Sequence, residues 1–269
     1  MEPLQYTSLV SMFFATCSRD DFGGWYKRTD GQWLHYSRDF LRDSAIYLSI
    51  ALNNRGLKPH DSVSIIAPSS PEWFIADIAT QINHAQVAPL FPNISSENFT
   101  FQCDDSGAQI LFVNTIAELD EPLHKFLPRF KLIICINPAS ELPENGIYWN
   151  NLIDEGKELA ESNRYFSWVD DQIQSIRPDD LFSIIYTSGS LGSPKGVDLS
   201  QRNMLAQIQN LMELFPLNSE EDVCLTILPV AHILARMAVY FYMLNVLRIY
   251  FRDTPKNVAT MLTEVHPTV

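Results

Sequence analysis

The stretch LFSIIYTSGSLGSPKGV, residues 181–197, decides the fold class of this 269-residue chain. Leu181–Tyr186 is an apolar run typical of a buried strand, and a segment rich in glycine, serine and threonine follows it. That segment leads toward a helix, which we expect to begin near Ser200. Because ligands of α/β proteins bind where the strands reach their carboxyl ends, the stretch predicts a ligand-binding loop.

The residue types of this loop suit a phosphate group. Glycines let backbone N–H groups approach an anion closely, and hydroxyl side chains add further donors. Pro194 stiffens the chain immediately before Lys195, whose ammonium group is worth a few kcal/mol at about 4 Å from a phosphate oxygen. The hydroxyl residues and glycines that we expect to contribute these donors are Thr187, Ser188, Gly189, Ser190, Gly192 and Gly196.

Two other kinds of loop, a flexible linker and a Walker A loop, fit this stretch less well. A plain flexible linker would not be expected to carry a Pro-Lys-Gly core between a strand and a helix. A Walker A loop needs glycine directly before its lysine and serine or threonine directly after it, whereas Pro194 and Gly196 stand in those places. The residues on either side of Lys195 therefore exclude an ordinary P-loop.

Apolar strands alternate with helical segments along the chain, which predicts an α/β protein with a mostly parallel sheet. A short hairpin, 25–27 with 33–36, precedes this series. Predicted strands cover 62–67, 87–91, 109–113, 132–136, 181–186, 223–228 and 248–251. Predicted helices cover the segment from Ser37 to Gly56, then 72–81, 96–104, 203–214, 232–246 and 256–265. Residues 137–145 are predicted to form a loop or a boundary.

The net charge and the cysteines of the chain indicate which classes of ligand and partner it can bind. The formal charge of −13 argues against nucleic acid or an anionic membrane as the main partner, but a local basic site for ATP remains compatible with it. The four cysteines lack metal-binding spacing, so we expect reduced buried thiols, no metal held by the protein and a cytoplasmic location. No signal peptide is recognised, and Met237–Leu247 is too short to span a membrane.

Three segments resemble the adenylate-forming superfamily of acyl-CoA synthetases, luciferases and adenylation domains. YTSGSLGSPKGV, residues 186–197, is similar to its phosphate-binding signature. LPVAHILAR, residues 228–236, resembles the Leu-Pro-x-Ala-His-x-x-x-Arg segment of long-chain fatty acyl-CoA synthetases, and residues 36–113 resemble that family's first α/β lobe. The resemblance covers most of the chain.

The resemblance implies a ligase that joins a fatty acid to AMP with ATP and Mg²⁺, then transfers the acyl group to coenzyme A. It places the β- and γ-phosphates of ATP on Thr187, Ser188, Gly189, Ser190, Gly192 and Lys195. His232 would orient the phosphates or the acyl carboxylate, although it could equally be a histidine that caps a helix. Arg236 could serve the site or pair with a carboxylate, and Val239–Leu247 could wall an acyl tunnel or pack in the core.

Four positions depart from the family pattern, which puts nucleotide affinity in doubt. Leu191 replaces a hydroxyl residue of the loop, and loss of that donor can cost about 1–3 kcal/mol. Gln201 replaces a histidine, Ala235 a glutamate, and His60 the glycine of a turn.

The resemblance also implies the organisation of the chain. Residues 1–269 would be a partial N-terminal adenylation domain, with a first lobe at about 57–180 and an incomplete second lobe at about 20–56 plus 181–269 that carries the phosphate loop. The adenine motif and C-terminal lid would lie in a longer synthetase, so we expect this part alone to be inactive and able to self-associate or touch a membrane surface. An acyl-AMP ligase that loads a carrier protein and a non-catalytic acyl- or nucleotide-binding module remain alternatives.

Overall fold

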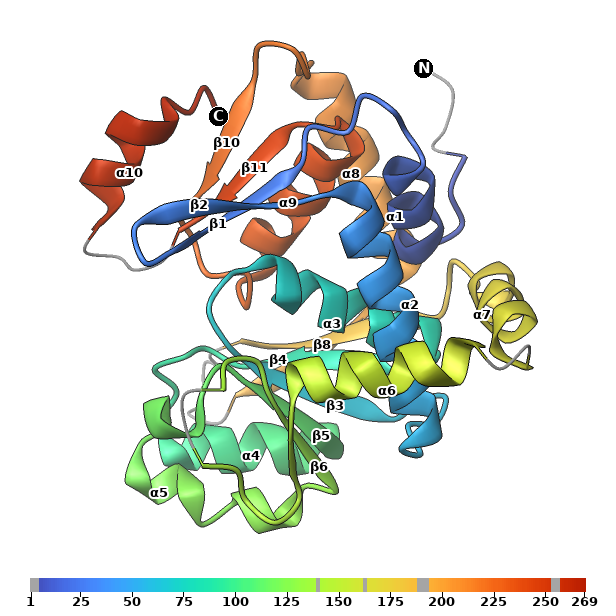
Figure 1. The fold of residues 1–269 in the computed structure, drawn as a ribbon, viewed down its shortest axis with the longest axis vertical. Helices are drawn as coiled ribbons and strands as arrows, with labels where there is room; N and C mark the ends of the chain where they lie inside the picture. Colours follow the sequence, from blue (N-terminus) through green and yellow to red (C-terminus); the bar gives the residue numbers. More distant parts are fainter. Residues whose placement is uncertain (1–4, 139–140, 162–163, 188–193, 253–256) are drawn as a thin grey trace.

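The computed structural model describes residues 5–138, 141–161, 164–187, 194–252 and 257–269. Their strands form two sheets, one of seven strands in the order β7-β6-β5-β3-β4-β8-β9 and one of four in the order β10-β11-β1-β2. Figure 1 shows the four-stranded sheet above the seven-stranded sheet, with helices between them and on their outer faces. The described part of the chain is thus an α/β structure of stacked layers.

The strands of the seven-stranded sheet are β3 (Ser62–Ile66), β4 (Gln86–Pro89), β5 (Ala108–Val113), β6 (Leu132–Cys135), β7 (Gly146–Tyr148), β8 (Leu181–Thr187) and β9 (Lys195–Ser200). The other sheet contains β1 (Trp25–Thr29), β2 (Gln32–Tyr36), β10 (Val223–Thr226) and β11 (Arg248–Phe251). The helices are α1 (Leu9–Cys17), α2 (Arg38–Asn54), α3 (Pro71–Ile82), α4 (Ser96–Ser106), α5 (Glu121–His124), α6 (Trp149–Glu161), α7 (Arg164–Ser175), α8 (Gln201–Leu214), α9 (Ile233–Leu244) and α10 (Val258–Val265). Two short 3₁₀ turns cover Ile116–Glu118 and Leu127–Arg129.

Helix α3 lies between the two sheets and joins their cores (Figure 1). Ser70 caps it by accepting a hydrogen bond from the backbone N–H of Trp73, and Pro71 occupies its first turn, where no N–H is needed. Every residue of α3 is buried, because one side of the helix meets each sheet. Such all-round burial explains why its sequence is apolar on more than one face.

Helices α2 and α6 approach each other unusually closely. Ser37 caps α2, and Gly56, at φ +91°, lies just beyond its end, as the sequence predicted. On α6, a Cβ atom added to Gly156 would lie 1.9 Å from the carbonyl oxygen of Tyr47. Only glycine therefore fits at this crossing.

The predicted α/β class is confirmed, and every predicted strand and helix overlaps an observed one. The helix expected near Ser200 is confirmed, because α8 begins at Gln201 with Ser200 as its cap. Strand β9, which lies between the loop and α8 and pairs antiparallel with β8, was not predicted. β9 was missed because it is an edge strand whose residues are mostly exposed, so it lacks the apolar character of the other strands. Helices α1, α5, α6 and α7 and strand β7 were also missed.

Other expectations concern the bounds of the lobes and the thiols. β8 and β9 are hydrogen-bonded into the seven-stranded sheet that holds β3–β7, whereas residues 20–56 and 223–251 supply the four-stranded sheet; the proposed lobe bounds remain a prediction. All four cysteines are buried and free, as expected. Among the described helices, none is long and apolar enough to cross a membrane.

Candidate functional site

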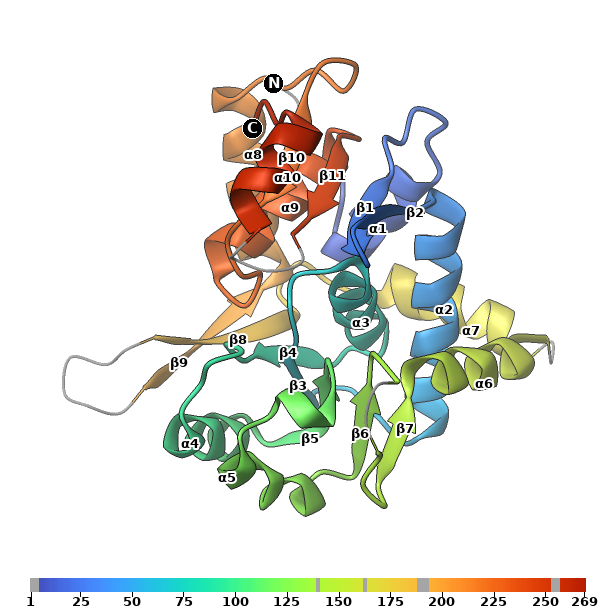
Figure 2. The same cartoon turned by 60° about the vertical axis from the view of Figure 1, so that its left-hand side comes forward.

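Strands β8 and β9 form a hairpin that carries the predicted phosphate loop. The register places Thr187 opposite Lys195, so the two strands end together where the loop begins. Figure 2 shows both strands extending from the body of the molecule. Lys195 is exposed and has no ion-pair partner among the described residues, which leaves its charge available to an anion. The other predicted phosphate ligands, Ser188, Gly189, Ser190 and Gly192, lie outside the described residues.

His232 lies at the amino end of α9 and its side chain is exposed. The backbone N–H of Leu234 donates to its Nδ1 atom at 3.2 Å. Because Nδ1 accepts this bond, a neutral His232 ring carries its proton on Nε2, which can donate to an oxygen of a ligand. His232 therefore caps a helix and also presents a donor to solvent.

A groove joins the hairpin to the turn that carries His232. It has a volume of about 720 Å³ and runs between β9, α8 and the first turns of α9. Asp198 and Leu199 of β9 line one side, and Ile233, Leu234 and Met237 line the other. The residues directly after His232 thus share a largely apolar cavity with the strand that begins at Lys195.

A second groove, of about 380 Å³, lies on the opposite flank of α9. Ala235, Ala238 and Tyr242 of α9 line it together with the carboxyl end of β10. Farther along α9, Val239, Phe241 and Leu244 join the main core. The segment 239–247 therefore packs chiefly in the core, although Val239 and Tyr242 also line the second groove.

Arg236 is fully buried and pairs with a carboxylate, as one of the two interpretations of its sequence predicted. Its Nε atom donates to Asp77 Oδ2 at 2.9 Å, its NH2 group donates to Asp77 Oδ1, and its NH1 group donates to Ser183 Oγ at 2.8 Å. Tyr240 also donates to Asp77 Oδ2, at 2.6 Å. Burial, and then the charge of Asp77, raise the pKa of Tyr240 well above its ordinary value.

Three departures from the family pattern have structural explanations. Gln201 is buried, accepts from the backbone N–H of Leu9 at 2.8 Å and donates to Gln81 Oε1 at 2.9 Å. Ala235 is buried beside the second groove. His60 adopts a φ of +69°, the left-handed conformation that a glycine would favour in this turn. Leu191 lies outside the described residues.

A basic cavity lies between the two sheets at the carboxyl ends of β3, β5 and β6. Its volume is about 210 Å³, and Lys27, Arg28 and Arg252 contribute three cationic side chains to its lining. Lys27 is paired with Glu72 at 3.0 Å, and Arg28 with Glu264 at 2.7 Å. This gathering of cations stands out in a chain with a net charge of −13.

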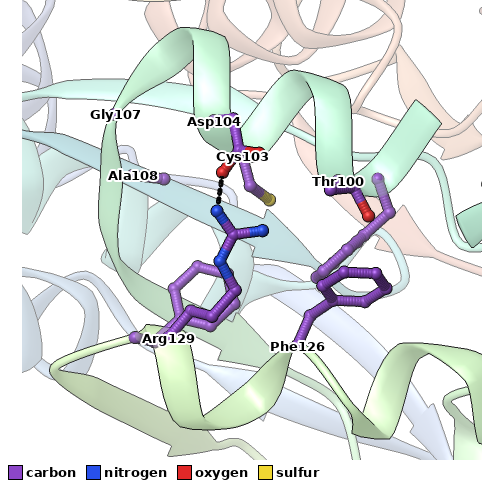
Figure 3. Close-up of a pocket in the computed structure, with 9 residues that line it drawn as sticks. Thr100, Cys103, Asp104, Gly107, Ala108, Phe126 and Arg129 are labelled. Carbon is purple, nitrogen blue, oxygen red and sulfur yellow. Dashed lines mark hydrogen bonds and ion pairs between the residues drawn. The ribbon is translucent and has the colours of Figure 1, made fainter. Parts of the chain in front are cut away.

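A pocket of about 180 Å³ lies between α4 and the segment 126–130 (Figure 3). Arg129 and Asp104 form an ion pair at this pocket, and the side chains of Cys103 and Phe126 line it. Burial raises the pKa of the Cys103 thiol to about 12, so this sulfur stays protonated at neutral pH. The Cys103 sulfur is therefore not a thiolate nucleophile at neutral pH.

Comparison with known proteins settles the family. A model of the family described as "AMP-binding enzyme" matches residues 22–269, which is most of the chain. The chain belongs to the AMP-binding enzyme family. Helix α1 lies outside the matched range, before its first residue.

Relatives of the chain include proteins named long-chain-fatty-acid–CoA ligases. ACSBG1 of Bos taurus is 28% identical over 218 residues, which cover 79% of this chain and 29% of the relative. FadD15 of Mycobacterium bovis is 26% identical over 274 residues, which cover 98% of this chain and 43% of the relative. The chain thus spans less than half the length of these two relatives.

Solved structures confirm the predicted adenylate-forming fold for this AMP-binding enzyme. An acyl-CoA synthetase from Brucella canis superposes with a TM-score of 0.75 at 18% identity, covering 98% of this chain and 47% of the other. A fatty acid AMP ligase from Legionella pneumophila gives a TM-score of 0.74 at 18% identity, covering 97% and 42%. At such identities the likeness concerns the fold alone.

Proposed function

We propose that this chain is the N-terminal part of a long-chain fatty acid–CoA ligase, which adenylates a carboxylic acid with ATP and then forms a thioester with coenzyme A. One observation carries the proposal. In a member of the AMP-binding enzyme family, the β8–β9 hairpin, whose loop lies between Thr187 and Lys195, shares an apolar groove with the residues that directly follow His232. The phosphates of ATP would bind at the loop between Thr187 and Lys195, and the apolar tail of the fatty acid would bind in the groove.

The phosphates of ATP, with Mg²⁺, would bind at the tip of the hairpin. Thr187 and Lys195 support this role, because their register places a hydroxyl and an ammonium group, which pairs with no carboxylate among the described residues, at the two ends of the loop. Ser188, Gly189, Ser190 and Gly192 complete the proposed set of ligands. Little covalent chemistry is required of the protein in this step, since the barrier is mainly charge repulsion and alignment.

The carboxylate of the fatty acid would lie near His232. With Nδ1 already accepting from the backbone N–H of Leu234, Nε2–H can donate to a carboxylate or phosphate oxygen and hold it in line for attack. The apolar tail would follow the groove past Leu234 and Met237, which is larger than the groove on the other flank of α9. Burial of each CH₂ group there contributes about 0.8 kcal/mol.

The basic cavity favours coenzyme A over a carrier protein as the acyl acceptor. Lys27 and Arg28 already pair with Glu72 and Glu264, so Arg252 is the cation of this lining that can offset the charge of the nucleotide phosphates of coenzyme A, groups that a protein-bound pantetheine arm lacks. Charge reversal at Arg252 should therefore weaken binding of coenzyme A to this chain and leave ATP binding unchanged.

Isothermal titration calorimetry, in which Mg-ATP or pyrophosphate is added to the purified chain, tests the phosphate site. Lys195→Ala should weaken both affinities about tenfold or more, as expected for loss of a charged donor. Lys157→Ala, on the exposed face of α6, is the matched control and should leave both affinities unchanged. Equal binding by Lys195→Ala and the wild-type chain would refute the assignment.

Incubation of the chain with ATP and palmitate gives a second test. We expect no appreciable release of pyrophosphate, because the family's adenine motif and lid lysine are not among these 269 residues. Turnover at ordinary rates would contradict that expectation and would show that the described residues suffice for adenylation.

A further inference from the structure

A chain of buried polar side chains connects six elements of the fold. Asp77 on α3 lies at its centre and accepts hydrogen bonds from Arg236 and Tyr240 on α9 and, at 2.9 Å, from Gln81 on α3 itself. Arg236 and Asp77 are each 0% exposed. A buried, fully engaged network of this kind has one arrangement of donors and acceptors, so it fixes the relative positions of the elements that supply it.

One end of this network lies on β8, the strand that leads into the predicted phosphate loop. Arg236 NH1 donates to Ser183 Oγ at 2.8 Å, and Ser183 Oγ donates to the carbonyl oxygen of Val87 at 2.6 Å. Val87 and Ser183 are also the residues paired in the register between β4 and β8. The side chain of Arg236 thus reaches β8 at the point where that strand is paired with β4.

The other end of the network lies on α1. Gln81 accepts from Gln201 at 2.9 Å, and Gln201 in turn accepts from the backbone N–H of Leu9 at 2.8 Å, in the first turn of α1. Gln201 is the first residue of α8, directly after β9. The network therefore holds both strands of the hairpin, β8 through Ser183 and β9 through the residue that follows it.

We propose that Arg236 is a positioning residue, which through Ser183 fixes the β8–β9 hairpin relative to the helix that begins at His232. The inference rests on the proposed function, because a hairpin that binds phosphate must be held in a fixed position relative to His232. Arg236 contacts no substrate in this scheme. Its guanidinium lies 5.2 Å from the ring centroid of Trp73 and 4.7 Å from that of Phe182, so the side chain is clamped in one orientation.

Stability alone is a poor explanation of this arrangement. A buried ion pair is often no more stabilising than apolar residues of the same volume, because taking two charges out of water is costly. What an arginine adds here is geometry, since its planar group donates in fixed directions to α3 and β8 at once. A lysine could neutralise Asp77 but would present a single ammonium point charge.

Two variants that each remove one hydroxyl separate positioning from stability. Ser183→Ala removes the bond from Arg236 to β8 together with the bond from Ser183 to the carbonyl oxygen of Val87, and Tyr240→Phe removes a bond to Asp77 that does not involve the hairpin. Amide hydrogen exchange of residues 182–187 and 195–199 should be about tenfold faster in Ser183→Ala and nearly unchanged in Tyr240→Phe. Pyrophosphate affinity should fall about fivefold in Ser183→Ala and stay within twofold of wild type in Tyr240→Phe.

Equal exchange in the hairpin of the two variants would overturn the inference. Arg236→Lys is the second variant should Ser183→Ala fail to fold, and it should speed exchange in the same two segments. If the wild-type chain does not bind pyrophosphate, the proposed function fails, whereas the exchange comparison still decides whether Arg236 positions the hairpin.

Discussion

Replacement of Asp77 by leucine should be among the most damaging single changes in the core. Arg236, which is 0% exposed, would keep its charge without a partner. The donors of Tyr240 and Gln81 would also lose their acceptor. Removal of one partner of a buried ion pair costs about 3–5 kcal/mol, so we expect the free energy of unfolding to fall by that amount.

The double variant Asp77→Leu/Arg236→Met supplies the decisive comparison. Because it removes both charges and fills the space with apolar atoms, it should recover most of the loss, leaving a deficit of about 1–3 kcal/mol from the unpaired hydroxyl and amide groups. The double variant should therefore be more stable than the single one, although it carries one more substitution.

Urea unfolding followed by tryptophan fluorescence measures these differences, and Trp73 beside Arg236 reports on the site directly. With a denaturant slope of about 3 kcal/mol per molar, the single variant should lower the midpoint by about 1 M or more. Asp154→Leu, at an exposed position of α6, controls for the substitution itself. A loss below about 1 kcal/mol in Asp77→Leu, or a double variant less stable than the single, would refute the reasoning.

Three further predictions concern stability and reactivity. Gly156→Ala should destabilise the chain by about 1–3 kcal/mol in urea unfolding, whereas Glu158→Ala on the same helix should not; equal stability would contradict the close helix crossing. Ser37→Ala should cost about 1 kcal/mol through loss of the cap of α2, and an unchanged urea midpoint would exclude that role. Burial raises the pKa of Cys17 and Cys103 from 9.0 to about 12, so the folded chain holds these protons more tightly than the unfolded chain does. Unfolding free energy should hence decline as the pH rises from 9 toward 12, and at pH 8 iodoacetamide should label these thiols only after unfolding; rapid labelling of the native chain would contradict this.

Much of the fold could be predicted because its strands are apolar on both faces and its helices carry caps. α6 had a readable signal, since Trp149, Leu152, Gly156 and Ala160 recur at helical spacing. β9 had little, because an exposed edge strand resembles a polar loop. Local pattern is therefore a sound guide to buried elements and a weak one to exposed edges.

Residues of the candidate site could be proposed from the sequence where they belong to short motifs. Contacts between residues that are distant in sequence could not. Lys195 and His232 belong to contiguous segments with recognisable spelling, and the groove between their elements supports reading them together. The partner of Arg236 lies 159 residues away in sequence, so no local pattern could name Asp77. Gln201, read as a lost family histidine, proves to be the residue that anchors α1.

The position of β9 at the border of its sheet has a consequence for handling the protein. Its backbone groups on one side face solvent, and Val197 is 44% exposed, so the strand could template pairing with another chain. Lys195 and Asp198 put charges of both signs along that border, and charges of this kind discourage intermolecular β-pairing. A variant that lacks the Lys195 charge should accordingly be tested for aggregation by light scattering, because aggregation would lower the apparent ligand affinity.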